Sequence, residues 1–345
     1  MSDGNGSKTG NGGNGNRGHP DLAAVRGDDD VIQPFMLERT GVRGRLVRAG
    51  PMVDAILTRH AYPAPVAQLL GEALALAGLM SGMMKYDGMF TLQMVGDGPV
   101  KMLVADFTSD GSVRGYADFD AERVAALNLD ESAPNAEVIK LLGQGRLAYT
   151  VDHQGARDRY QGIVELNGAT LAECMHHYFQ QSEQVVSSIQ LACGRLTEGD
   201  GTQRWRAGGL MLQRLPEEAG ERTVEDPDEE WRRSVILMSS VTQTEMVRPD
   251  ITAHELLYRL FHEEGVRVFD TWPLKDQCRC SRARVETVLM QMDTDELQEL
   301  KTDRGLVEVT CQYCSTVYEF DDAQLHALQQ EGRGGEGGHG QSGTA

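Results

Sequence analysis

Apolar positions dominate one long stretch early in the chain and predict a buried helix there. Between Pro63 and Lys85, apolar residues recur at steps of mostly three or four, which is the period of a helix face. The other sides of this helix are largely apolar as well, so it should be buried inside the fold rather than lie on its surface. Its longest apolar run, from Ala73 to Met84, is too short to span a bilayer.

Shorter apolar stretches predict strands joined by tight turns. Residues 96–99 (Gly-Asp-Gly-Pro) form such a turn, because glycine permits the positive φ angles that hairpins need. A helix is expected from Thr170 to Glu183, with Thr170 as its N-cap. The expected strands are residues 90–95, 100–107, 113–119, 147–151, 160–166, 185–192 and 209–215. Since hairpins pair antiparallel, residues 31–215 are expected to form an α+β core, a mixed and mostly antiparallel sheet with helices.

Residues 216–277 are expected to be a helical linker that follows the core. Its first part, residues 216–233, is acidic and poor in apolar residues, and we expect a solvated loop there. Two amphipathic helices should follow, one over residues 235–246 and one that begins at a capping box of Thr252 and Glu255. Because isolated helices of about 12 residues are marginal in water, both helices must lie on another surface.

Four cysteines in two close pairs mark the next segment, residues 278–328. Cys278 and Cys280 form a CxC pair, and thirty residues separate them from a CxxC pair, Cys311 and Cys314. Four thiolates at this spacing can close a tetrahedral site around one zinc ion per chain, at Zn–S distances of about 2.3 Å. Each close pair supplies two ligands at little loop-closure cost.

The pattern between the pairs predicts a small mixed domain. Ser281 can cap one helix, and a box-like cap of Asp293 and Glu296 can begin a second. Strands are expected at residues 306–311 and 316–320. The ligands should therefore lie in a loop before a helix and at a hairpin turn.

The spacing leaves two interpretations of the zinc site open. One is a permanent structural site. The other is a site that doubles as a redox switch, because two thiolates of a CxC step can chelate one metal or, with strain, bond each other. Zinc-bound thiolates are nucleophilic enough to attack peroxide or hypochlorous acid. Loss of the metal should unfold the segment, because about 50 residues barely support a core and zinc contributes about 10–16 kcal/mol.

Charge and composition narrow the partners and the compartment. With 33 basic and 52 acidic side chains, the formal net charge is −19, which argues against nucleic acid or an anionic membrane as the main partner. Residues 1–30 are polar, lack the apolar stretch of a secretory signal and are expected to be disordered, as is the tail at residues 329–345. The cysteine usage fits the reducing cytoplasm. Cys174 and Cys193 lie in apolar stretches and are interpreted as buried small hydrophobic residues.

Two other classes of function compete with a redox-controlled binding protein. The main alternative is a structural zinc ribbon that contacts nucleic acid or protein, although residues 278–328 carry five basic and ten acidic side chains. A zinc enzyme is less favoured, because four cysteine ligands leave no open coordination position for substrate or water. No Walker-type phosphate-binding motif is present, and we assign no catalytic residue.

Taken together, these features resemble one family, the redox-regulated 33-kDa heat shock chaperones of bacteria. The resemblance covers roughly residues 31–328. Its carriers are residues 96–99 (GDGP), 178–184 (YFQQSEQ), 257–270 (LYRLFHEEGVRVFD) and the two cysteine pairs. The long Gly/Asn-rich N-terminal extension and the Gly-rich tail depart from the family pattern, and we assign them no function.

The resemblance implies an ATP-independent holdase that is zinc-bound and inactive when reduced. Oxidation is expected to form the disulfides Cys278–Cys280 and Cys311–Cys314, to release zinc, and to unfold first this segment and then the linker. The active form is expected to be a cytoplasmic homodimer that binds unfolding client proteins.

Unfolding of the linker would uncover apolar side chains that become candidates for client binding. These candidates are Val235, Ile236, Leu237, Met238, Leu256, Leu257, Leu260 and Phe261. Methionines 80, 83, 84, 89, 94 and 102 could also form a plastic binding surface, but we assign them to the core, where such residues more often lie.

Overall fold

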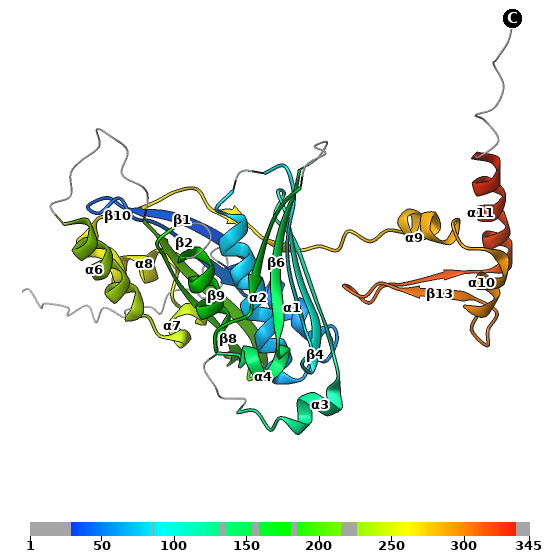
Figure 1. Ribbon diagram of the computed structural model, residues 1–345, viewed down its shortest axis with the longest axis horizontal. Helices are drawn as coiled ribbons and strands as arrows, with labels where there is room; N and C mark the ends of the chain where they lie inside the picture. The colour runs from blue at the N-terminus through cyan, green and yellow to red at the C-terminus, as the bar shows by residue number, and fades with distance from the viewer. Residues whose placement is uncertain are drawn as a thin grey trace, which may run out of the picture.

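The computed structural model describes residues 29–84, 86–130, 135–153, 159–180, 185–214 and 226–335 (Figure 1). The predicted disorder of residues 1–28 and 336–345 lies outside these ranges. Two six-stranded sheets with helices between them form the core, and a small lobe follows at the C-terminus. The predicted α+β class with mostly antiparallel pairing is confirmed, since one strand pair, at the edge of the second sheet, is parallel among those in the described residues.

Sheet A has the strand order β10-β1-β2-β9-β8, and β11 also pairs with β1. Its strands are β1 (Val31–Leu37), β2 (Arg43–Ala49), β8 (Ser187–Thr197), β9 (Gln203–Gln213), β10 (Val266–Val268) and β11 (Trp272–Pro273). The hydrophobic pattern does not predict β1 or β2, because three arginines interrupt β2. Two of these arginines nevertheless lie away from solvent, because Arg48 is buried and Arg45 is half-buried.

Sheet B has the strand order β12-β5-β4-β3-β6-β7. Its strands are β3 (Gly88–Gly96), β4 (Val100–Thr108), β5 (Ser112–Phe119), β6 (Gly145–His153), β7 (Tyr160–Glu165) and β12 (Lys275–Asp276). The five strands β3 to β7 match the predicted hairpins to within about two residues at each end, as sequence patterns allow. Strand β12 pairs parallel with β5 and comes from the linker.

Five helices in the described residues belong to the core, and the second of them lies between the two sheets (Figure 1). They are α1 (Pro51–Thr58), α2 (Ala64–Ser81), α3 (Ala121–Ala126), α4 (Val138–Leu142) and α5 (Leu171–Tyr178). Helix α2 has a mean hydropathy of 1.3 over 18 residues, which by length and composition would suit a membrane span, but 89% of that window is buried inside the protein. It is the core helix that the sequence predicts. Thr170 caps α5 as predicted, although α5 ends at Tyr178, and residues 181–184 lie outside the described ranges.

The linker helices cover the face of sheet A that points away from α2 (Figure 1). They are α6 (Pro227–Ser239), α7 (Gln243–Val247), α8 (Ala253–Phe261) and the 3₁₀ turn η3 (His262–Glu264). Their apolar sides join Phe35, Leu46 and Leu212 of the sheet in one buried cluster. The predicted capping box at Thr252 and Glu255 is present at the start of α8.

Helix α6 corrects the prediction of a solvated acidic loop over residues 216–233. The helix begins at Pro227, where the Asp226 carboxylate accepts hydrogen bonds from the next backbone N–H groups, and acidic residues of the first turn favour the positive end of the helix dipole. The same acidity that suggested a loop therefore starts a helix. The helix predicted over residues 235–246 is also divided, because a second capping box at Thr242 begins α7. Residues 215–225 lie outside the described ranges.

After η3 the linker is no longer helical. Gly265 has a φ of 70°, which an L side chain rarely adopts, and it turns the chain into an extended strap of residues 266–277. The strap supplies β10 and β11 to the edge of sheet A and then β12 to the edge of sheet B. One short segment therefore runs along both sheets of the core before it reaches Cys278.

The C-terminal lobe, residues 278–335, contains the two helices and two strands that the sequence predicts, and one further helix. The predicted elements are α9 (Arg282–Leu289), α10 (Thr294–Glu299), β13 (Val307–Thr310) and β14 (Val317–Phe320), and the further helix is α11 (Asp322–Gly335). Ser281 caps α9, and Asp293 with Glu296 forms the predicted capping box of α10. Helix α11 is not predicted by the sequence pattern, and it corrects the expectation of a disordered tail from residue 329, because it runs to Gly335.

Candidate metal centre

The folded lobe brings the two cysteine pairs together. Cys278 and Cys280 lie in the extended chain before α9, and Cys311 and Cys314 lie in the turn that joins β13 to β14. We call this turn, residues 311–316, the knuckle. Its geometry is set by backbone hydrogen bonds, with the Cys311 N–H donating to the Thr316 carbonyl and the Ser315 N–H donating to the Cys311 carbonyl. Ser315 has a φ of 57°, so the turn closes tightly behind the second pair.

The four sulfur atoms lie at distances that suit one tetrahedral metal ion. All four lie within 4.8 Å of one another. Cys278 and Cys311 are 3.7 Å apart and Cys280 and Cys314 are 3.3 Å apart, and all four are free thiols. A regular tetrahedron with Zn–S bonds of about 2.3 Å has sulfur–sulfur edges of about 3.8 Å, so the residues present fit zinc. Both of these contacts cross between the pairs, and the disulfides predicted within the pairs stay a prediction.

Two hydroxyl groups, one in β14 and one just before it, hydrogen-bond with two of the sulfurs. The Tyr318 hydroxyl donates to the Cys280 sulfur at 3.2 Å, and the Thr316 hydroxyl lies 3.2 Å from the Cys314 sulfur. Such second-sphere groups orient ligands and tune a metal site. The spacing of the cysteines does not identify these hydroxyl groups, although their positions two and four residues after the last cysteine are a signal, since alternate strand residues share a face.

The thiols cannot all ionise in this arrangement without a cation. Burial, together with hydrogen bonds to the other three thiols, raises the pKa of Cys280 to about 12, although the Tyr318 hydroxyl works against this. Burial also acts to raise the pKa of Cys314, but its hydrogen bonds with Thr316 and the neighbouring thiols bring it down to about 6. Crowded thiols with such divided pKa values are the donor set that a divalent cation resolves, because it stabilises every thiolate at once.

The apolar core of the lobe is small. Five residues form its buried cluster, namely Leu289, Leu297, Val307, Phe320 and Leu325. Burial of a large apolar side chain contributes about 1.5–3 kcal/mol. Five such side chains together contribute less than the conformational entropy that is lost when the whole lobe becomes ordered. The lobe therefore depends on a further source of stability, and the four-sulfur cluster is the feature of the described residues that can supply it.

The structure places the candidate client-binding residues unevenly. Met238, Leu256, Leu257, Leu260 and Phe261 are at most 3% exposed and pack on sheet A. Leu237 is partly buried against the same cluster, and Val235 is half-buried. Ile236 differs, because it is 62% exposed on the outer side of α6, where the spacing of the helix turns it away from the sheet. Ile236 is thus a surface residue already, and the expectation that linker unfolding uncovers it is wrong.

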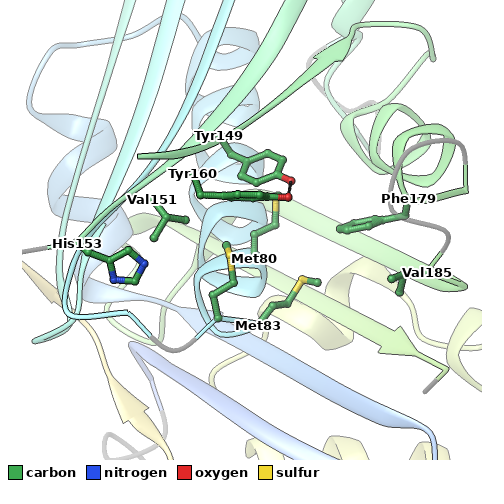
Figure 2. A pocket seen from close by; sticks show the side chains of 9 residues that line it. Met80, Met83, Tyr149, Val151, His153, Tyr160, Phe179 and Val185 are labelled. Atoms are coloured by element: carbon green, nitrogen blue, oxygen red, sulfur yellow. Dashed lines mark hydrogen bonds between the residues drawn. The ribbon is translucent and has the colours of Figure 1, made fainter. Parts of the chain in front are cut away.

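A second apolar feature lies where α2 ends beside sheet B. A cavity of about 420 Å³ is lined by residues of α2, β6, β7 and the chain after each of α2 and α5. Figure 2 shows Met80 beneath the rings of Tyr149 and Tyr160, with Met83 on the side of Val185. The methionines that were assigned to the core divide here. Met80 is buried, whereas Met83 and Met84 are half-buried and face the cavity.

Cys174 and Cys193, the two cysteines outside the cluster, are both buried, as predicted. Burial raises the pKa of each thiol, which disfavours the reactive thiolate form.

Comparison with known proteins identifies relatives of the whole core, linker and lobe. The family model of the Hsp33 protein matches residues 30–321. A 33 kDa chaperonin of Caulobacter vibrioides is 42% identical over 293 residues, which cover 85% of this chain and 95% of the relative. A 33 kDa chaperonin of Pseudomonas fluorescens is 38% identical over 302 residues, which cover 87% of this chain and 94% of the relative.

A solved structure agrees with the fold. The crystal structure of the 33 kDa chaperonin (heat shock protein 33 homolog) of Thermotoga maritima matches with a TM-score of 0.71 and 27% sequence identity. The match covers 88% of this chain and 98% of that structure, so it includes the core and the lobe alike.

Proposed function

Because the chain belongs to the Hsp33 family, we propose that it is a chaperone that binds unfolding proteins and that its four-cysteine lobe controls this binding. The relatives are named chaperonins, which supports binding rather than catalysis. The observation that carries the redox part of the proposal is the cluster of four sulfurs within 4.8 Å, in a lobe with five buried apolar residues.

Zinc, when bound, supplies a cross-link and the charge that keeps four thiolates together. Cys278, Cys280, Cys311 and Cys314 are its proposed ligands in the reduced, inactive protein. With these thiolates held, the lobe stays folded, the strap stays on both sheets, and α6 to α8 stay on sheet A. The apolar residues Phe35, Leu46 and Leu212 of the sheet and the inner sides of α6 and α8 remain covered.

Oxidation reverses this arrangement by removing the ligands. A thiolate attacks peroxide to give a sulfenic acid and hydroxide, and a second thiol then displaces water to form a disulfide. Two such reactions, which consume two peroxides, form Cys278–Cys280 and Cys311–Cys314. Disulfide sulfurs no longer carry the charge that binds the metal, so zinc leaves and the lobe unfolds. The linker helices, which are too short to be stable alone, then expose the apolar surface that holds a client.

Partners and compartment follow from the same chemistry. The resting state needs free thiols, which the cytoplasm maintains, and the oxidised form is proposed to be a homodimer. The net charge of −19 disfavours nucleic acid and anionic membranes as partners. A zinc ribbon that reads nucleic acid is the alternative, and a salt-dependent shift of RNA or DNA by the reduced protein would favour it.

The test compares the reduced and oxidised protein as suppressors of aggregation. The protein is treated with peroxide at raised temperature, and light scattering of a thermally unfolding client is followed while released zinc and free thiols are counted. We expect suppression only after oxidation, with one zinc released as four thiols disappear. Cys174→Ser is the matched control, because this buried thiol lies outside the cluster and its loss should leave the switch intact. Equal suppression by the reduced and oxidised proteins would overturn the proposal.

A further inference from the structure

Tyr313, between the two cysteines of the CxxC pair, lies against the core. The guanidinium carbon of Arg114 in β5 lies 3.9 Å from the centre of the Tyr313 ring, and the Tyr116 ring centre lies 6.1 Å away. The carbonyl oxygen of Tyr313 is 3.3 Å from Arg59 Nη1 and 3.3 Å from His60 Nε2. The ring and the main chain of one knuckle residue therefore both contact the core, where α1 ends and on the outer face of sheet B.

Arg114 is held in place to receive this ring. Thr91, Asp106 and Arg114 stand in register on three neighbouring strands. The Thr91 hydroxyl donates to Asp106 Oδ1 at 2.7 Å, and Arg114 Nε and Nη2 contact Asp106 Oδ2 at 2.7 and 2.6 Å. The Asp106 carboxylate is almost fully buried, so the guanidinium has little freedom to move. A fixed cation under an aromatic face is a favourable stacking site.

The same arginine also reaches the other cysteine pair. Cys278, like Asp106 and Tyr313, lies close enough to the Arg114 guanidinium to interact with it electrostatically. One side chain of the core thus lies near a residue from each half of the metal centre. This position arises only when the lobe is folded, since the knuckle turn and the chain before α9 must both be in place.

The docking site is continuous with the strap. Arg59, which contacts the Tyr313 carbonyl, also forms an ion pair with Asp276 of β12. The Gln277 N–H donates to the Val113 carbonyl at 3.1 Å and the Lys275 N–H to the Gly111 carbonyl at 2.9 Å. A strand of two residues has few hydrogen bonds of its own, so the contacts of its neighbour at Arg59 matter for whether it stays paired.

We propose that Tyr313 is the positioning residue that docks the folded knuckle on the core, with Arg114 and Arg59 as its receptors, and that this docking keeps β12 paired with β5. Docking is then a step separate from metal binding: zinc folds the lobe, and Tyr313 transmits the folded state to the strap. The consequence for client binding rests on the proposed function. The docking itself does not, because it can be measured in the reduced, zinc-loaded protein without a client.

The test is hydrogen exchange of the strap in the reduced, zinc-loaded full chain. Tyr313→Ala should keep one zinc per chain and the absorption spectrum of a cobalt-substituted tetrathiolate site, while amides of residues 274–277 exchange faster by about tenfold or more. Tyr313→Phe keeps the ring and the main chain and should exchange like the natural protein. Gln312→Ala changes the exposed neighbour within the same CxxC pair and is the matched control.

A second variant removes the Arg114 side of the stack and leaves the knuckle, which carries Tyr313, unchanged. Arg114→Met should speed exchange of the strap like Tyr313→Ala. Adding Tyr313→Ala to Arg114→Met should speed exchange no further, because the stack between the two side chains is already lost. Unchanged exchange in Tyr313→Ala, or loss of zinc from it, would overturn the proposal. A failed aggregation assay with normal strap protection would count against the proposed function instead.

Discussion

The core and the C-terminal lobe are stabilised in different ways. The core packs two sheets around α2, where sixteen consecutive residues from Val66 to Ser81 are buried, and a second apolar cluster lies under the linker helices. The lobe buries five apolar residues around four thiols. The first region can fold by the hydrophobic effect, whereas we propose that the second depends on a bound ion. A chemical change at four sulfur atoms can therefore remove one region and leave the other folded.

The linker connects these two regions and depends on both. Its helices pack on sheet A, and two buried arginines fix the end of α7: Arg206 Nε donates to the Val247 carbonyl at 2.6 Å and Arg48 Nη2 to the Arg248 carbonyl at 2.5 Å. Its strap ends at Cys278. The linker should thus loosen from the lobe side first, because the core contacts do not change on oxidation.

Removal of the metal from the reduced protein tests the contrast most severely. A chelator should unfold the lobe, since the loss of about 10–16 kcal/mol of metal binding exceeds what its small core can replace. Hydrogen exchange should show loss of protection in β13 and β14 and unchanged protection in α2. Cys280→Ser should have the same effect without a chelator. Retained protection of β13 in metal-free protein would show that the lobe folds by itself.

The buried carboxyl of Glu72 in α2 offers a way to change the stability of the core without changing the lobe. Burial raises the pKa of Glu72 from 4.5 to about 8. Hydrogen bonds from the Ala136 N–H, at 2.9 Å from Oε1, and from the Asn135 side chain lower this pKa and oppose the effect of burial only in part. The unfolded chain loses this proton above pH 4.5, whereas the folded core keeps it until about pH 8. Core stability should therefore fall as the pH rises between these values and level off above them.

Glu72→Gln should remove that fall. A shift of this size corresponds to about 5 kcal/mol at most, so the variant should match the natural protein near pH 4 and be more stable near pH 8. Denaturant unfolding at the two pH values measures the difference. The zinc affinity of the lobe at pH 8 should not change, and a coupled change in both would contradict the independence of the two regions.

A cavity in the core should have a comparable or smaller effect. Leu74 is 1% exposed in α2, and Leu74→Ala should lower the free energy of unfolding of the core by about 2–5 kcal/mol. Thermal unfolding of the core should shift while the amount of zinc bound per chain stays the same. Val288→Ala, at a residue 59% exposed in α9, is the control that should alter neither.

Substitutions at two matched helix caps, one in the linker and one in the lobe, should have the smallest effect on stability. Thr252 and Asp293 each begin a helix with a capping box, and replacement by Ala costs about 1 kcal/mol at such positions. Thr252→Ala should speed hydrogen exchange of α8 in the reduced protein and lower the peroxide concentration that activates it. Asp293→Ala should leave that concentration unchanged, because zinc dominates the stability of the lobe. Equal effects of the two variants would show that the lobe is as marginal as the linker.

The sequence predicts those parts of the molecule whose signals are local. The capping boxes of α8 and α10, the hairpins of sheet B and the cysteine pairs each depend on residues a few positions apart, and the structure contains all of them. Helix α1 shows the limit. At its N-terminus, the backbone N–H groups of Gly50 and Met52 donate hydrogen bonds to the Asp30 carboxylate. This capping residue lies twenty residues before Gly50 in the chain. No local pattern contains such a cap.

The acidic start of α6 and the contacts of Tyr313 were missed for related reasons. Acidic residues suit both a solvated loop and the first turn of a helix, and only the capping geometry at Asp226 distinguishes them. Tyr313 sits within the metal motif, but its partners Arg59 and Arg114 lie about two hundred residues or more earlier in the chain. Such long-range contacts depend on the topology of the fold, which spacing does not encode.

We propose that the metal-bound lobe keeps the linker on the core. The most direct test of this proposal follows hydrogen exchange at β13, α8 and α2 in one sample during peroxide treatment at raised temperature. The account predicts that β13 loses protection as zinc is released, that α8 loses it next together with the appearance of client binding, and that α2 keeps it throughout. Protection of α8 that persists after zinc and all four thiols are gone, in protein that already binds client, would contradict the account.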